Sequence, residues 1–472
     1  MRRRTQHRLV ALGVGCCAAA ATLVTAAGEA PASPQRGAAN AAVSLRDAHH
    51  VKVIKVKRVG ARQLQATIRP KALARPLGVR IILPVHYRPD RRYPTLYLFP
   101  GTSGHSTDWV KAGGAVPTTR PYDLITVTSD IGFDGNGGSW FSNWVDRSTA
   151  MGKAQFETYN AHQLIPWIDA NLATIRNRTG RAVAGLSQGG YGAAILAARY
   201  PDKFVEMASF SGAPEIDRAL TARAGANAVI SATMVGLNHV QPDAPFGNVV
   251  TDQMNWKGHD PAYIVRNLRG MGLWLATADG APGKYDDPVT NPVGTASQGG
   301  IESLTHFSTQ DFVQRLRHLH MPVQVYDYNS GTHAWPYWAR DLRHFIKPLM
   351  HQFANPPAPP TRVHYVSTEK HWKSFGWKVR WQRSEPIAWG SIHHANRHGF
   401  RVKGTGVAII RSAPIFKRGT MYSIAPAGSK SYVTPPDRHG RLYFQLNTGD
   451  QTPKSTRVRI TAMPKQHHRP ID

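Results

Sequence analysis

Short apolar runs and stretches of helical spacing alternate along the first three quarters of the chain. Near its start hydrophobic and polar residues alternate one by one, which predicts antiparallel strands with one wet face. Later runs are continuously apolar, as in buried parallel strands. We expect strands at 51–57, 63–69, 79–84, 95–99, 124–128, 183–186, 205–210, 273–277 and 323–328, and helices at 156–172, 188–200, 304–319 and 337–350. This order predicts a mostly parallel sheet with helices on both faces.

The pattern changes after a proline-rich segment, Asn-Pro-Pro-Ala-Pro-Pro, at residues 355–360. Such a segment forms a stiff linker. Beyond it, short apolar runs are separated by Gly, Pro and Asn, which predicts an all-β sandwich over residues 361–472. A chain of 472 residues also exceeds one ordinary core. We therefore expect an α/β domain over residues 50–354 and a separate sandwich domain.

Residues 1–32 have the pattern of an export signal. Four arginines lie among the first eight residues, an Ala-rich apolar run follows, and small residues come next. A membrane anchor is the alternative, although the run is short for a membrane span and contains glycines. Cleavage would leave residues 33–49 as a disordered leader. The mature protein would be secreted to the extracellular space, with association with the cell wall as one option, and would lack cysteine, since Cys16 and Cys17 are the only two.

The chain is strongly basic, with a formal net charge of +29 at pH 7. Residues 355–472 hold 20 Lys and Arg against 5 Asp and Glu. This balance predicts that the C-terminal domain meets an anionic cell-wall polymer or lipid surface. Nucleic acid is the usual alternative partner. No nucleic-acid-binding signature is visible, so we expect none.

The segment Gly185-Leu186-Ser187-Gln188-Gly189 fits G-x-S-x-G. This pattern is a nucleophile elbow when a strand precedes it and a helix follows, because the sharp turn lifts the serine clear of the sheet. The glycines permit close backbone approach. The alternatives are a chance match in a Gly-rich loop and a serine that only caps the helix. The flanking apolar strand and Ala-rich helix favour Ser187 as a nucleophile, with the Gln188 N–H as an oxyanion donor.

A serine nucleophile needs a general base and an acid that orients the base. On α/β-hydrolase folds they follow in the order Ser, acid, His. His333 lies in a loop after the last expected strand of the α/β domain, where that fold places its base. The acid stays open on this evidence. Asp279 directly follows a strand and Glu302 begins the next helix, whereas Asp286 and Asp287 are interpreted as solvated loop charges.

Three segments together resemble the secreted antigen 85 mycolyltransferases, within the wider esterase D group. They are Gly-Leu-Ser at 185–187, Glu-Thr through Leu to Trp at 157–167, and Gly-Thr-His-Ala-Trp-Pro-Tyr-Trp at 331–338. The likeness covers roughly residues 75–350. It implies an α/β-hydrolase fold and favours Glu302, at the head of the penultimate helix, over Asp279. The second oxyanion donor would be the Thr102 N–H, in the loop that follows an early strand.

Departures from the family pattern leave the substrate open. Pro100 and Ser103 stand where the family has an aspartate and an arginine, and its cysteine pair is missing. Trp140 and Trp144, in an aromatic loop, and Trp335 are candidate substrate-binding residues, because aromatic faces pack against acyl chains and sugars. For the loop tryptophans, local core packing is the alternative.

These observations predict a secreted serine esterase that cleaves carboxylic esters through Ser187, His333 and Glu302. No metal or organic cofactor is implied. One alternative is an acyltransferase of the mycolyltransferase or diacylglycerol acyltransferase type, which passes the acyl group to a sugar or lipid alcohol. A non-enzymatic alternative is a cell-wall binding protein on a hydrolase fold.

Overall fold

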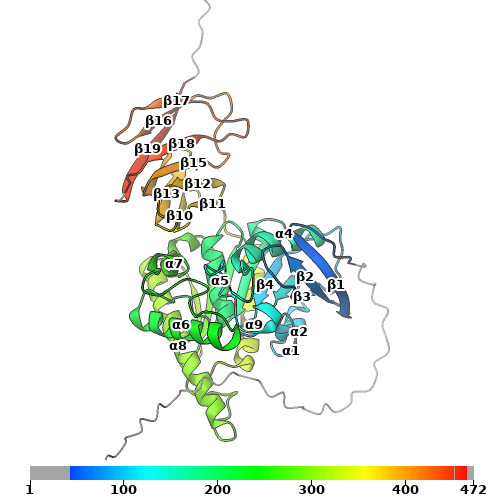
Figure 1. Ribbon diagram of the computed structural model, residues 1–472. Coiled ribbons are helices and arrows are strands. Elements are labelled where there is room, and N and C mark those ends of the chain that lie inside the picture. The colour runs from blue at the N-terminus through cyan, green and yellow to red at the C-terminus, as the bar shows by residue number, and fades with distance from the viewer. Residues whose placement is uncertain (1–42, 148, 451, 465–472) are drawn as a thin grey trace, which may run out of the picture.

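The computed structural model describes residues 43–464, apart from 148 and 451 (Figure 1). The expected export signal lies outside these residues. A nine-stranded sheet has the order β1-β2-β3-β5-β4-β6-β7-β8-β9. Its strands are β1 (Val51–Gly60), β2 (Gln63–Pro70), β3 (Leu77–Ile82), β4 (Thr95–Phe99), β5 (Ile125–Ser129), β6 (Arg181–Leu186), β7 (Glu206–Phe210), β8 (Gly272–Thr277) and β9 (Gln324–Asp327). The pairs β1/β2, β2/β3 and β3/β5 are antiparallel and the others are parallel. This mixed sheet is α/β-hydrolase-like.

Helices cover both faces of the sheet, as the apolar pattern predicts. One face packs against α1 (Asp108–Lys111), α2 (Ala115–Thr119) and α9 (Trp335–Ala354). The other packs against α4 (Ile165–Asn171), α5 (Gln188–Arg199) and α8 (Pro292–His318). Alternate residues of a central strand therefore enter different cores: Ala182 and Ala184 of β6 face α9, whereas Val183 faces the α5 side.

Some helices differ from the sequence prediction. The expected helix at 156–172 is divided into α3 (Phe156–Thr158), a π-helical segment η2 (Tyr159–Leu164) and α4. Helix α8 starts twelve residues earlier than expected, because its first turns are small and polar and carry no apolar period. Glu302 therefore lies within this helix, not at its head. Helices α6 (Leu220–Ala232) and α7 (Gln253–Gly258) were not predicted.

The described end of the expected leader, residues 43–49, packs against the α/β domain. Leu45 is buried in the main core. The Arg46 carbonyl accepts hydrogen bonds from Trp167 Nε1 at 3.0 Å and Asn171 Nδ2 at 3.1 Å. This part of the leader is therefore a piece of the domain, because an apolar residue and an ordered backbone carbonyl find partners on α4.

The C-terminal region is all-β, in two antiparallel sheets that enclose a core of their own. The six-stranded sheet has the order β10-β13-β14-β19-β16-β17, and the four-stranded sheet the order β11-β12-β15-β18. Their strands are β10 (Val363–Ser367), β11 (His371–Ser374), β12 (Trp377–Gln382), β13 (Gly390–Asn396), β14 (Gly399–Gly404), β15 (Val407–Arg411), β16 (Tyr422–Pro426), β17 (Tyr432–Thr434), β18 (Tyr443–Asn447) and β19 (Lys454–Ala462).

This sandwich contacts the α/β domain at the C-terminal end of α5 (Figure 1). The Tyr365 hydroxyl donates to the Arg199 carbonyl at 2.7 Å. The Asn267 side-chain amide donates to the Val366 carbonyl and accepts from the Val366 N–H, both at 2.9 Å. The same amide also donates to the Ala198 carbonyl. Backbone-directed bonds of this kind fix the orientation of the first strand of the sandwich. Among the described helices, none combines the length and apolar character needed to cross a membrane.

Candidate active site

Ser187 lies between β6 and α5 in a backbone conformation that few L-residues adopt, with φ 52° and ψ −127°. It occupies the N-cap position of α5, yet its side chain makes no capping hydrogen bond. The flanking residues Leu186 and Gln188 are buried, whereas Ser187 is half-buried. Strain of this kind persists only where surrounding structure imposes it, and it gathers at functional sites. The strained backbone and the uncapped side chain together make Ser187 a candidate nucleophile.

The glycines around the turn allow the strained backbone to pack closely. A Cβ at Gly185 would collide with the Gly189 backbone, and a Cβ at Gly189 would collide with the Phe99 and Pro100 carbonyls at the end of β4. Only glycine fits either position without displacing backbone. The elbow is thereby pressed against the loop that carries Thr102.

His333 is oriented by Glu302. His333 Nδ1 lies 2.7 Å from Glu302 Oε2, and Glu302 is completely buried. The Ala278 N–H donates to Glu302 Oε1 at 3.0 Å and so fixes the carboxylate. An imidazole whose Nδ1 faces a carboxylate carries its proton on that nitrogen, so Nε2 is left as an acceptor. His333 Nε2 is buried and has no hydrogen-bond partner among the described residues.

Asp279, the other candidate acid, is exposed. Its carboxylate accepts from the Ala281 N–H at 2.7 Å, within its own turn. Glu302 is therefore the carboxylate that the fold brings to His333. The structure gives no hydrogen bond between Ser187 Oγ and His333, so the complete triad stays a prediction.

Asp286 supports the histidine loop, a role that its interpretation as a solvated loop charge missed. Its carboxylate accepts from the Thr332 hydroxyl at 2.5 Å and the Tyr337 hydroxyl at 2.7 Å, on either side of His333. Burial, followed by the hydrogen bond to Asp286, raises the pKa of Tyr337 above its usual range, so this phenol remains a donor. The only sequence signal was the position of these hydroxyl groups beside the histidine.

Gln188 joins the two candidate oxyanion donors through its side chain. Its Nε2 donates to Thr102 Oγ1 at 3.1 Å, and its Oε1 accepts from the Ser139 and Trp140 N–H groups at 3.0 and 3.2 Å. Gln188 is also the first residue of α5, where a backbone N–H has no partner within the helix. The N–H groups of Thr102 and Gln188 thus belong to adjacent backbone segments beside Ser187. Their role as an oxyanion hole stays a prediction.

The loop that carries Trp140 and Trp144 serves mainly as core. Trp144 is 1% exposed and its indole N–H donates to the Ser139 carbonyl at 2.9 Å. Trp140 is 4% exposed and packs against Tyr191. This burial favours the core-packing alternative for both side chains, and their role in substrate binding stays a prediction. The sequence could not distinguish the cases, because burial of an aromatic residue depends on distant partners.

Trp335 is half-buried and stands edge-on to Trp109 and Trp338, with ring centroids 5.4 Å away in both cases. Trp338 in turn meets the His333 ring edge-on at 4.9 Å. Trp335 therefore belongs to the aromatic wall next to the histidine and keeps some free surface. Of the three tryptophans proposed for substrate binding, it is the one with accessible ring area.

Comparison with known proteins places the chain in a family. The family model described as "Putative esterase" matches residues 71–347, more than half of the chain. Esterase Rv1288 of Mycobacterium tuberculosis is 40% identical over 144 residues, 30% of this chain and 30% of that protein. Diacylglycerol acyltransferase/mycolyltransferase Ag85C of Mycobacterium leprae is 28% identical over 232 residues, 47% of this chain and 63% of its own length. The chain thus spans less than two thirds of either relative.

Among solved structures, the crystal structure of Mycobacterium tuberculosis MPT51 aligns with a TM-score of 0.48 and 23% identity. It covers 60% of this chain and 96% of that one. The family match contains Ser187, Glu302 and His333, together with both loops that surround the elbow. The chain belongs to the esterase family.

Proposed function

We propose that this protein is a serine esterase that cleaves carboxylic esters through an acyl-enzyme. Ser187 Oγ attacks the ester carbonyl while His333 Nε2 takes its proton. The N–H groups of Thr102 and Gln188 stabilise the negative oxygen of the tetrahedral intermediate. His333 then gives the proton to the leaving alcohol. Water, activated by the same nitrogen, releases the acid and restores Ser187.

One observation carries the proposal: Glu302 lies 2.7 Å from His333 Nδ1, and His333 Nε2 has no hydrogen-bond partner within the described part of the chain, in the domain that carries a strained Ser187. A binding protein needs neither a buried carboxylate on a histidine nor a strained serine. The family match supports ester chemistry and is independent of this geometry.

Labelling with a fluorophosphonate probe tests the proposal. The wild-type protein is expected to form one covalent adduct, located on Ser187 by peptide mass spectrometry, and Ser187→Ala to form none. Ser429→Ala, at an exposed serine of the sandwich, is the matched control and should label like the wild type. Labelling that persists in Ser187→Ala, or no labelling of the folded wild type, would favour the non-enzymatic alternative.

Acyl transfer is the second candidate function, because the Ag85C relative carries that activity in its name. Transfer requires that an alcohol reach the acyl-enzyme ahead of water. Ser103 replaces the arginine of the resembled family, and its backbone and hydroxyl both bond to Gly137. This leaves no long cationic side chain there to hold a polar acceptor.

We therefore propose that hydrolysis dominates on short esters, with transfer appearing for long acyl chains or lipid-like acceptors. The measurement is the ratio of free acid to new ester, from short- and long-chain esters incubated with glycerol, trehalose or diacylglycerol. Efficient transfer to trehalose from a short ester would make acyltransferase the primary activity.

We also propose that the protein is exported and cleaved near residue 32, from the pattern of residues 1–32. Expression of the full chain in an actinobacterial host should release a form whose N-terminal peptide begins after that segment. Recovery of uncleaved protein in the membrane fraction would support the anchor alternative.

A further inference from the structure

The outer face of the four-stranded sheet is basic. Residues of β11, β12, β15 and β18 alternate between the sandwich core and the surface. The outward positions are His371, Lys373, Lys378, Arg380, Gln382, Val407, Ile409, Arg411, Tyr443, Gln445 and Asn447. Four of these are Lys or Arg and none is acidic. The charge on this face is therefore of one sign.

Like charges stand directly opposite one another on neighbouring strands. Lys373 of β11 pairs with Lys378 of β12, which pairs in turn with Arg411 of β15. Directly opposed like charges destabilise a sheet. Desolvation lowers the pKa of Lys378, and repulsion from three neighbouring cations lowers it further: Arg411, Lys373 and Arg441. No acid on this face offsets the repulsion, so a bound anion would relieve it.

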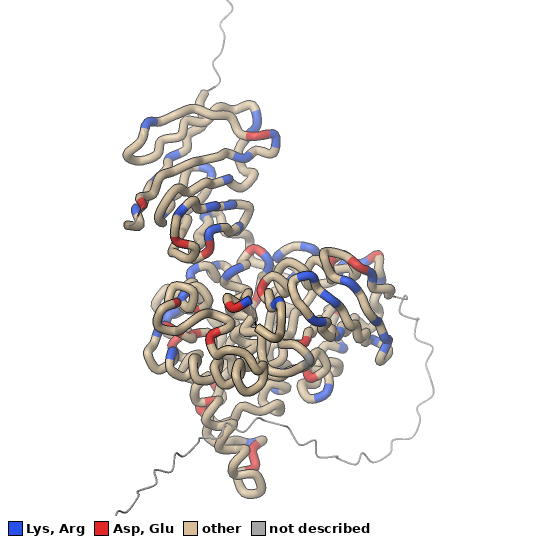
Figure 2. The backbone as a smooth tube through the Cα atoms, viewed as in Figure 1, with Lys and Arg blue, Asp and Glu red and all other residues tan. Residues whose placement is uncertain are grey.

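Three of the four Lys and Arg residues on this face also line a cleft of about 930 Å³ between the sandwich and the α/β domain. Lys373, Lys378 and Arg380 form part of its sandwich wall, and Arg176 and Lys203 part of the opposite wall. Burial lowers the pKa of Lys203, whereas the nearby Asp202 raises it. Repulsion from Arg181 and Lys373 lowers it further. Lys203 and Lys373 thus act on each other across the cleft. Figure 2 shows Lys and Arg positions on both sides of this junction.

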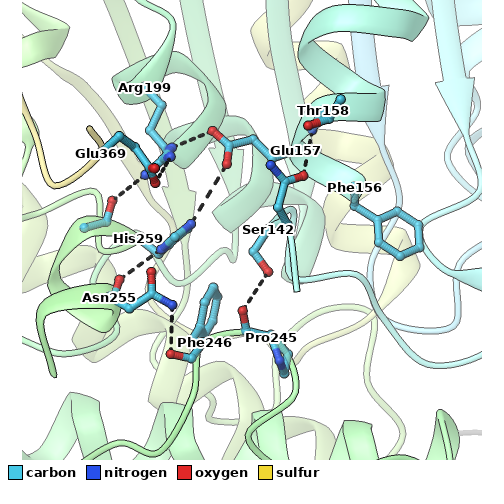
Figure 3. Close-up of polar contacts among 12 residues, drawn as sticks. Ser142, Phe156, Glu157, Thr158, Arg199, Pro245, Phe246, Asn255, His259 and Glu369 are labelled. Carbon is cyan, nitrogen blue, oxygen red and sulfur yellow. Dashed lines mark hydrogen bonds and ion pairs between the residues drawn. The ribbon is translucent and has the colours of Figure 1, made fainter. Parts of the chain in front are cut away.

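Most carboxylates of the cleft already have partners. Asp169 is paired with Arg181 at 2.7 Å. Glu157 and Glu369 both pair with Arg199, as Figure 3 shows. Asp202, beside Lys203, is the remaining acid on the lining. Six cations have no carboxylate within ion-pair distance among the described residues, and we call them the cation track: Arg176, Lys203, Lys373, Lys378, Arg380 and Arg411.

We propose that the cation track binds a linear polyanion, which runs from the outer face of the four-stranded sheet into the cleft. Adjacent strands lie about 4.8 Å apart, so the row of Lys373, Lys378 and Arg411 offers one charge on each of the three neighbouring strands β11, β12 and β15. Lys203 and Arg176 continue the row on the other domain. A flexible chain with repeated anionic groups can follow such a row and replace the repulsion between its members with ion pairs.

The shape and composition of the track favour a polymer chain over a membrane or a nucleic acid. A flat bilayer does not enter a cleft between two domains, and peripheral membrane binding also draws on inserted apolar residues. On this face Tyr443 is the single exposed large hydrophobic side chain. Single-stranded nucleic acid binds to successive aromatic platforms, and one tyrosine at a sheet edge does not supply them.

The test is binding of the full chain to long-chain inorganic polyphosphate, used as a model linear polyanion, at several salt concentrations. The variant Lys373→Gln/Lys378→Gln should bind about tenfold or more weakly at low salt, and its log–log salt slope should fall by about two units, because each lost contact releases fewer counterions. Its melting temperature should equal or exceed that of the wild type, since an opposed like-charge pair is removed.

The matched control is Arg401→Gln/Arg457→Gln, which removes another directly opposed, exposed pair from the outer face of the six-stranded sheet. It should bind polyphosphate like the wild type. Equal weakening of both double variants would mean diffuse attraction by net charge, and the track would be rejected. Tighter binding to anionic phospholipid vesicles, or to single-stranded DNA of equal charge, would also overturn the proposal.

Discussion

Arg199 Nη2 and Glu369 Oε1 lie 2.8 Å apart, and this ion pair joins the last residue of α5 to the sandwich. The same guanidinium contacts Glu157 at 2.6 Å, and Glu157 also accepts from the Tyr200 hydroxyl. Figure 3 shows Arg199 between the two carboxylates. Because α5 begins directly after Ser187, the proposed nucleophile, the sandwich holds the far end of the helix that this residue precedes. The C-terminal domain is docked on the catalytic domain, not merely tethered to it by a linker.

This ion pair predicts a pH-dependent contribution to stability. Arg199 holds the pKa of Glu369 below its usual value. Because the pKa of Glu369 is lower in the folded state than in the unfolded state, the ion pair stabilises the fold at pH values above the unfolded-state pKa of 4.5. This stabilisation is lost as the pH falls through the folded-state pKa. At pH 7, Glu369→Gln should lower the free energy of unfolding by about 1 kcal/mol, and the difference from wild type should shrink in acid. Glu385→Gln, elsewhere in the sandwich, is the control for thermal melts from pH 7 to pH 3.

The proposed triad predicts a large kinetic effect at Glu302. Glu302→Gln should lower kcat on a soluble ester by about 10³- to 10⁴-fold, because the imidazolium loses its partner and the wrong tautomer becomes stable. Asp279→Asn should be nearly silent, since that side chain caps its own turn. Ester hydrolysis by both variants, with circular dichroism to check folding, gives the answer. The opposite ranking would transfer the acid role to Asp279.

The hydrogen bond from Gln188 Nε2 to Thr102 Oγ1 is expected to position the two proposed oxyanion donors. Thr102→Val removes the acceptor of Gln188 Nε2 and should lower kcat about tenfold, less than loss of a donor itself. Substrate binding should change little, so KM stays near wild type. Thr102→Ser keeps the hydroxyl and should restore kcat. Steady-state kinetics separate this result from general damage, which would alter both variants and both constants.

Asp286 and its neighbour Asp287 provide a matched pair. Asp286→Asn weakens the bonds from Thr332 and Tyr337, so the loop around His333 loosens and kcat should fall about tenfold. Asp287 accepts from Thr290 within its own turn, so Asp287→Asn should retain activity. Equal rates for the two variants would show that the histidine loop needs no support from Asp286.

Glu206 predicts a loss of stability as pH rises. It is 5% exposed, and burial raises its pKa to about 8. A raised carboxyl pKa means that the folded state keeps a proton that the unfolded state has released, so stability falls between about pH 4.5 and pH 8. Glu206→Gln should therefore melt at higher temperature than wild type at pH 8. The two melting curves should converge near pH 4, and a constant difference would contradict the assignment.

The parts of the site encoded in one stretch of sequence were predictable. The strand, turn and helix around Ser187 follow each other directly in the sequence. The small residues of the turn and the apolar residues of the strand and helix can both be recognised there. His333 was placed by order along the chain. Its acid was not, because Asp279 and Glu302 both lie between the last two strands of the sheet, and residue spacing alone does not reveal which one meets the imidazole. The family resemblance was needed to favour Glu302.

Features that depend on long-range packing were not predictable. Asp286 meets hydroxyl groups 46 and 51 residues away. Trp144 is buried by Phe156 and other residues outside its loop. The polar first turns of α8 carry no apolar period. Docking of the sandwich through Arg199 and Glu369 joins residues 170 positions apart, and no pattern in the sequence relates the two.

Helix α5 works as a fixed spacer. Its 12 residues rise about 18 Å, with Ser187 at one end and the wall of the inter-domain cleft at the other. The polymer segment that we propose to bind in that cleft would lie about 18 Å from Ser187, the proposed nucleophile. The proposed attachment site and the proposed site of ester cleavage would then be separate in space. An enzyme attached in this way would act on esters about two nanometres from its point of attachment.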